Sequence, residues 1–119
     1  MSEINKIKYR VKRSEFIGFL HNCNSAEELG NILETYKRKF HDARHICYAV
    51  ILNDNEIFNE DREPLGTSGT VMLNELKKRS LKNKLVIIVR YFGGIKLGKV
   101  LLRRTYLDVT VNILDKLLI

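Results

Sequence analysis

The sequence lacks the features of a membrane protein and of a disulfide-stabilised protein. It has two cysteines, Cys23 and Cys47, too few for a four-ligand metal site without other residues. Cys47 lies in an apolar stretch and is predicted to be a core thiol. There is no apolar run of 18 residues, and the N-terminal stretch MSEINKIKYR has no apolar signal segment. We therefore expect a cytoplasmic protein with reduced cysteines, no metal, no cofactor and no membrane partner.

Acidic residues are missing from one long part of the chain. Between Leu76 and Leu107 there are ten basic residues and no acidic one, and the whole chain has a net charge of +7. The acids gather instead between residues 54 and 63. A one-sided distribution of charge favours an anionic partner such as RNA. The alternative is a solvated basic surface with no partner.

Regular spacing of apolar residues predicts the secondary structure. Apolar and basic residues alternate from Lys6 to Lys12, which indicates a strand with one buried face and one basic face. Ser25 and Glu28 form a capping box that begins a helix over residues 26–39. We expect further strands over residues 16–20, 46–52 and 85–91, and a short hairpin partner at 56–58. Further helices are expected over residues 70–79 and from Lys96 or Leu97 to the C-terminus.

This order of elements predicts one domain over residues 1–119. The expected fold is α/β in the broad sense (α+β): a two-layer sandwich with one mixed sheet of about four to five strands and helices on one face. The strand over residues 85–91 is almost continuously apolar, so it should be central.

A glycine-rich turn follows that strand and resembles a phosphate-binding P-loop. Gly93, Gly98 and Lys99 have the P-loop spacing, but Val100 stands where a hydroxyl would coordinate Mg²⁺. We therefore expect no binding of MgATP at this turn. The pair Gly93-Gly94 instead lets the chain turn sharply, so at least one should have a positive φ or lie too close to another backbone for a side chain.

A second loop carries carboxylates, hydroxyls and glycines. Its candidate site residues are Asp61, Glu63, Gly66, Thr67, Ser68 and Gly69. Thr67, Ser68 and the backbone amides could bind a phosphate at the start of the next helix, or one hydroxyl could simply cap that helix. One carboxylate, Glu63, beside a threonine is not a catalytic constellation, so we assign no catalytic residue.

Three segments resemble the IMPACT/YigZ family: DARHICYA at residues 42–49, EPLGTSG at 63–69 and RYFGGIKLG at 90–98. Residues 14–17, SEFI, also resemble the opening strand of that family. The resemblance implies a module similar to ribosomal-protein and elongation-factor domains, with a role around translation control rather than catalysis. Eukaryotic members belong to regulators that restrain a kinase of translation initiation by competing for its activator.

The chain departs from the family pattern in two places. The family usually has small residues at the positions of Arg62 and Leu65, and a glycine pair at the positions of Val100 and Leu101. The second change argues against an anion site that needs close approach to the backbone in the first turn of the last helix.

We therefore expect a non-enzymatic, translation-associated module that contacts RNA or a ribosomal surface. The alternatives are a protein-interaction regulator of a stress-kinase pathway and an enzyme acting on a phosphorylated small molecule. Tyr48, Tyr91 and Phe92 either stack on bases or belong to the core. The expected binding residues are Lys6, Lys8, Arg10, Lys12, Arg90, Tyr91, Gly93, Gly94, Lys96, Lys99, Arg103 and Arg104.

Overall fold

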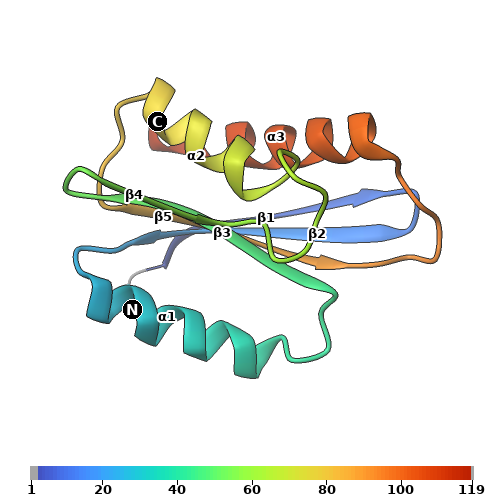
Figure 1. The fold of residues 1–119 in the computed structure, drawn as a ribbon, viewed down its shortest axis with the longest axis horizontal. Coiled ribbons are helices and arrows are strands. Elements are labelled where there is room, and N and C mark those ends of the chain that lie inside the picture. Colours follow the sequence, from blue (N-terminus) through green and yellow to red (C-terminus); the bar gives the residue numbers. More distant parts are fainter. Residues whose placement is uncertain (1–2, 119) are drawn as a thin grey trace.

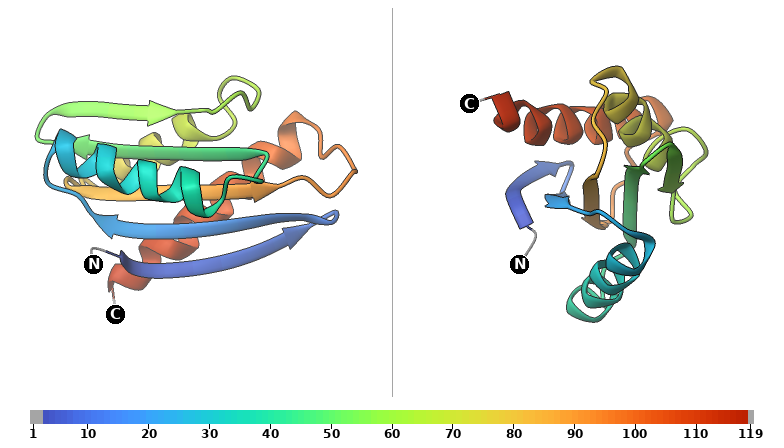
Figure 2. Two further views of the ribbon diagram at one scale, coloured as in Figure 1. Left: turned by 90° about the horizontal axis from the view of Figure 1, so that it is seen from below. Right: turned by 90° about the vertical axis from the view of Figure 1, so that its left-hand side faces the viewer.

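The computed structural model describes residues 3–118, which form one five-stranded sheet and three α-helices (Figures 1 and 2). The strands are β1 (Glu3–Val11), β2 (Ser14–Asn22), β3 (His45–Leu52), β4 (Asn55–Asn59) and β5 (Lys84–Tyr91). The helices are α1 (Ala26–Lys39), α2 (Gly69–Lys78) and α3 (Lys99–Asp115), and a 3₁₀ turn, Lys116–Leu118, follows α3. None of the helices in this part of the chain is both long and apolar enough to cross a membrane.

The strand order is β1-β2-β5-β3-β4, and every neighbouring pair is antiparallel. The α+β class with a single sheet is thus confirmed, whereas the prediction of a mixed sheet is wrong. The reason is the position of β5. The crossover through α1 makes β2 and β3 parallel to each other, but β5 lies between them and runs antiparallel to both.

Helices cover both faces of the sheet, so the prediction that they share one face is also wrong. Figure 1 shows α2 and α3 above the sheet and α1 below it. The core is accordingly split in two: Val86 and Ile88 of β5 pack with the α2–α3 layer, and Leu85, Ile87 and Val89 pack with α1. All five side chains are fully buried, which confirms the central position of β5. Burial of side chains of this size contributes about 1.5–3 kcal/mol each.

The helix ends follow local chemistry. The backbone N–H of Glu28 donates to the Ser25 hydroxyl at 3.1 Å, as the capping box predicts, although the Glu28 carboxylate reaches back to the N–H of Asn24. The last helix begins at Lys99, two or three residues later than predicted. Gly98 precedes it with a φ of +80°, a conformation that a helix cannot include.

The glycine turn after β5 has the predicted geometry. Gly94 has a φ of +88°, and a Cβ on Gly93 would lie 2.1 Å from the carbonyl carbon of Arg13. The N–H of Gly93 also donates to the hydroxyl of Ser14 at 3.3 Å. The absence of a side chain therefore lets the β1–β2 turn pack directly against the segment that leads into α3.

Candidate nucleic-acid interface

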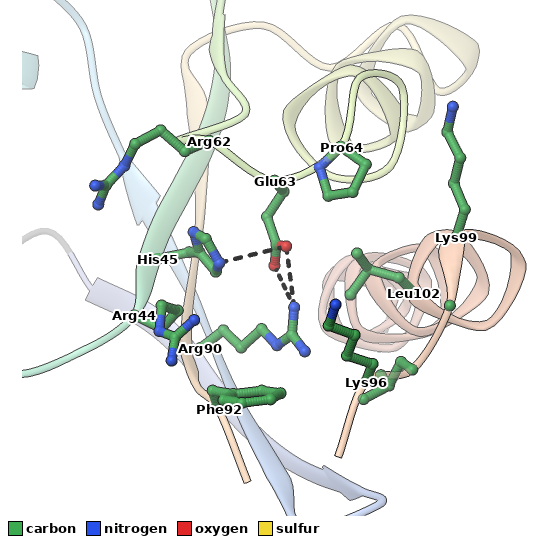
Figure 3. A pocket seen from close by; sticks show the side chains of 12 residues that line it. Arg44, His45, Arg62, Glu63, Pro64, Arg90, Phe92, Lys96, Lys99 and Leu102 are labelled. Carbon is green, nitrogen blue, oxygen red and sulfur yellow. Dashed lines mark hydrogen bonds and ion pairs between the residues drawn. The ribbon is translucent and has the colours of Figure 1, made fainter. Parts of the chain in front are cut away.

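A cleft of about 480 Å³ opens where the loops before α2 and α3 meet the ends of β3 and β5 (Figure 3). We call it the cationic cleft, because five of its twelve lining residues are lysines or arginines. These are Arg44, Arg62, Arg90, Lys96 and Lys99. The other lining residues are His45, Glu63, Pro64, Phe92, Leu97, Gly98 and Leu102.

The floor of the cleft is a buried ion pair between Arg90 and Glu63. The two residues are 5% and 6% exposed, and Nη1 of Arg90 donates to both Glu63 oxygens at 3.0 and 2.8 Å. The hydroxyl of Tyr106 donates to the same carboxylate. Burial, together with Cys47 and Glu63 beside it, raises the pKa of Tyr106 well above its ordinary value, so this hydroxyl keeps its proton. Glu63 is therefore a structural counter-ion rather than a free general base.

The other reactive side chains near the floor are also engaged. Nδ1 of His45 donates to the carbonyl of Asp61 at 2.7 Å, and its Nε2 lies 3.4 Å from Glu63. Cys47 is fully buried, as predicted for a core thiol, and its Sγ donates to the carbonyl of Glu60 at 3.2 Å. Burial raises the pKa of the Cys47 thiol to about 12, so it is not a thiolate nucleophile at neutral pH.

The start of α2 already holds a carboxylate, that of Glu60. Its oxygens accept from the N–H groups of Gly66, Ser68 and Thr70 at 2.5, 3.0 and 3.3 Å, and from the Ser68 and Thr70 hydroxyls at 2.8 Å. Partial burial alone would raise the pKa of Glu60, but these hydrogen bonds bring it below its ordinary value. Glu60 therefore occupies the position that a phosphate would take, a role that sequence reasoning missed.

The predicted hydroxyl cap of α2 is wrong for the same reason. The Ser68 side chain precedes the helix but makes no capping hydrogen bond, because its Oγ donates to Glu60 instead. The Thr67 hydroxyl donates to the carbonyl of Pro64 at 2.5 Å. The loop from Asp61 to Gly69 is thus held by hydrogen bonds to Glu60 and within itself.

The rim of the cleft carries cations that the protein leaves unpaired. Within residues 3–118, Arg44, Lys96 and Lys99 make no ion pair, and Arg62, with an 81% exposed side chain, pairs only with the neighbouring carboxylate at 3.8 Å. The guanidinium of Arg44 lies 4.7 Å from the centre of the Phe92 ring. The positive charge of Arg90 on the floor is balanced by Glu63, whereas most rim cations have no carboxylate partner in this part of the chain. The cleft therefore presents a positive electrostatic potential to solvent.

The structure separates the predicted basic residues into two groups. Arg90, Lys96 and Lys99 line the cationic cleft, and Lys12 and Arg104 line an adjoining hollow of about 380 Å³ that shares Lys99 with it. Arg103 is exposed on α3 but lines neither hollow. Tyr91, Gly93 and Gly94 lie next to the cleft in sequence rather than in its lining.

The rest of the basic strand faces the other way. Ile7, Tyr9 and Val11 of β1 pack on the α3 side, so the alternating Lys6, Lys8 and Arg10 project from the opposite face of the sheet. Lys6 lies over the ring of Phe19, which belongs to the α1 side of the core. Lys8 and Arg10 approach Glu15 at 3.7 and 4.0 Å. The two basic rows therefore do not form one surface.

Sequence reasoning missed Arg44 and Arg62 as cleft residues. Arg44 stands in the DARHICYA segment directly before β3, and Arg62 precedes the EPLGTSG segment. The only indication in the sequence was that both arginines lie within or beside these family-like segments. The segments themselves come together only in the folded protein. Among residues 3–118, no group of three or more histidine, cysteine, aspartate or glutamate side chains is arranged to hold a metal ion.

Curated relatives match most of this chain. IMPACT family member YvyE from Bacillus subtilis is 38% identical over 99 residues, which are 81% of this chain and 46% of the relative. IMPACT family member YigZ from Escherichia coli is 34% identical over 93 residues, which are 74% of this chain and 46% of the relative. The chain thus spans about half the length of the curated relatives it matches.

Solved structures share the fold. A crystal structure of a hypothetical protein superposes with a TM-score of 0.89 and 28% identity, over 98% of this chain and 62% of that one. The two-domain translational regulator Yih1 superposes with a TM-score of 0.53 and 20% identity, over 93% of this chain and 46% of that one, a likeness of fold alone. Residues 12–114 match the family model described as the Impact N-terminal domain, and the chain therefore belongs to the Impact N-terminal domain family.

Proposed function

We propose that this chain is a non-enzymatic, translation-associated module that contacts RNA, free or on a ribosomal surface, through the cationic cleft. The observation that carries the proposal is the charge arrangement of the cleft. Its buried carboxylate is matched by Arg90, whereas Arg44, Lys96 and Lys99 on its rim make no ion pair within residues 3–118. The regulator Yih1, which shares the fold, is described as translational, which supports placing the module in translation.

The alternatives receive less support from the geometry. Neither acid–base candidate of the cleft is unengaged, because Glu63 is paired with Arg90 and His45 hydrogen-bonds to a backbone carbonyl, and Cys47 is buried outside the lining. A protein-docking role would use the acidic loop, but Glu60 and Glu63 are bound internally. The exposed side chains of Leu65 and Val100, at 82% and 80%, favour protein docking, although single exposed apolar residues are common on protein surfaces.

Contacts with phosphates have a thermodynamic signature. Each phosphate neutralised on a single strand releases bound counterions and contributes roughly −0.7 to the slope of log K against log salt concentration. Four rim cations can therefore give a slope of roughly −2 to −3. Phosphate contacts carry no base information, so affinity should depend little on sequence.

The test is binding of a fluorescein-labelled 12-nucleotide RNA, followed by anisotropy from 20 to 300 mM salt. Replacing Lys96 and Lys99 by glutamine should make the slope shallower by about 1.4 and weaken binding to different sequences equally. The control is the double variant Lys8→Gln, Arg10→Gln, which removes the same charge from the opposite face of the sheet.

Two results would count against the proposal. If the wild-type protein gives no RNA signal at the lowest salt, the chain is not an RNA-binding module. If the control variant lowers the affinity for RNA as much as the cleft variant does, then RNA binds at another surface or the effect reflects only the net charge of the protein.

A further inference from the structure

The cationic cleft continues beyond its own rim. A second hollow of about 380 Å³ lies on the α1 side of the sheet, between the C-terminal end of α1 and β3. Its lining includes Lys37 and Phe40 from the end of α1 and Tyr48 from β3. It also includes Arg44 and Arg62, which line the cationic cleft as well. We call this second space the α1 hollow.

A third space connects the two. It has a volume of about 350 Å³ and is lined by Asp42, Ala43, Arg44, Arg62, Tyr91 and Phe92. It shares Arg44, Arg62 and Phe92 with the cationic cleft, and Arg44, Arg62 and Ala43 with the α1 hollow. Because Arg44 and Arg62 line all three spaces, these spaces adjoin one another around the end of the sheet, and we call the three together the groove. Figure 1 shows the N-terminal end of α3 above this end of the sheet and the C-terminal end of α1 below it.

The groove has a positive net charge, because its lining holds six lysines and arginines and three carboxylates. Two of the carboxylates also accept hydrogen bonds within the protein: Asp42 accepts from the Tyr91 hydroxyl at 2.9 Å, and Asp61 accepts from the N–H of Ile46 at 2.6 Å. Glu63 is paired with Arg90, as described above. The exposed Lys37 makes no ion pair within the described residues, so the positive rim extends onto the α1 layer.

Flat groups lie beside these cations. The Arg44 guanidinium stacks on Phe92 in the middle of the groove, and Phe40 and Tyr48 line the α1 hollow. Unpaired bases stack on aromatic rings and on guanidinium planes, and this stacking does not depend strongly on base identity. Cations beside flat groups suit a strand that offers both phosphates and bases.

We propose that a single strand of RNA follows this groove from the start of α3, across Arg44 and Arg62, to the end of α1. This inference rests on the proposed function, because it assumes that the cationic cleft binds RNA. A groove that passes from one helical layer to the other requires a ligand that bends sharply, which a stacked duplex resists over such a short distance. The bound segment should comprise about four or more nucleotides, as in other single-strand-binding modules.

The test is a length series of labelled oligouridylates of two, four, eight and twelve nucleotides, measured by anisotropy at 0.1 M salt. Affinity should rise about tenfold or more between two and eight nucleotides. Lys37→Gln should weaken binding of the eight-nucleotide RNA by about fivefold, the effect of one lost phosphate contact at this salt concentration, and leave the dinucleotide unaffected. Arg38→Gln is the matched control, because Arg38 is exposed on the same turn of α1 but lies outside the lining of the groove.

The possible outcomes separate the two proposals. Equal affinity for two and eight nucleotides, or equal effects of Lys37→Gln and Arg38→Gln, would refute the groove but leave an RNA-binding cleft. A short RNA duplex that binds as tightly as the single strand would also refute it. No binding of any oligonucleotide would refute the proposed function itself.

Discussion

Replacing Glu63 by glutamine tests whether the floor of the cationic cleft is a structural ion pair. The substitution keeps the size of the side chain but removes the charge that faces Arg90. Because Arg90 is 5% exposed, its guanidinium would remain buried without a counter-ion. Its Nε is already buried without a hydrogen-bond partner among the described residues, and its Nη2 donates only to the neutral hydroxyl of Ser14, at 3.4 Å, which supplies no counter-charge.

The magnitude follows from the burial of both partners. Removing one member of a buried ion pair costs about 3–5 kcal/mol, whereas exposed pairs contribute about 0–1 kcal/mol. Glu63 also accepts from Tyr106, and that hydroxyl would lose its charged acceptor. We therefore expect Glu63→Gln to lower the free energy of unfolding by about 3–5 kcal/mol.

Urea denaturation measures this loss directly. With a slope of about 1.5 kcal/mol/M, the midpoint should fall by about 2–3 M at an unchanged slope. Glu15→Gln is the control, because the ion pairs of Glu15 among the described residues are with the exposed side chains of Lys8 and Arg10 and should contribute little to the midpoint. A loss below 1 kcal/mol for Glu63→Gln would refute the reasoning, since the buried charge of Arg90 would then need no partner.

Three further predictions concern the surroundings of the cleft. Gly93→Ala should destabilise the protein by about 1–3 kcal/mol through overlap with the backbone of Arg13, and an unchanged melting temperature would contradict this. Glu60→Gln should destabilise most at neutral pH. Because the pKa of Glu60 is lowered on folding, its contribution is complete above the ordinary 4.5 and disappears as the pH falls through the folded value. The urea midpoints of the wild-type protein and of Glu60→Gln should therefore converge in acid. A difference between the two midpoints that stays constant with pH would contradict this prediction. Cys47 should resist iodoacetamide at pH 8 in the native protein, because burial raises its pKa to about 12; rapid labelling would show that the thiol is accessible.

Interactions between residues close in sequence were sufficient to predict several features of the structure. The capping box of α1 depends on residues three positions apart, and the alternation in β1 depends on the pleat of a single strand. The glycine turn was predictable because only glycine tolerates the φ of Gly94 and the backbone contact at Gly93. The apolar run of β5 predicted a central strand, although the helices were wrongly predicted to lie on one face of the sheet.

Only the tertiary structure decided which charges remain available. Alternation placed Lys6, Lys8 and Arg10 on one face of β1, but whether α3 covers that face or the other depends on packing between distant segments. Glu63 and Arg90 are 27 residues apart, and Glu60 reaches donors up to 10 residues ahead. The sequence alone does not show whether a carboxylate is solvated, ion-paired or hydrogen-bonded to the start of a helix. Its partner is determined by the path of the chain rather than by its neighbours in sequence.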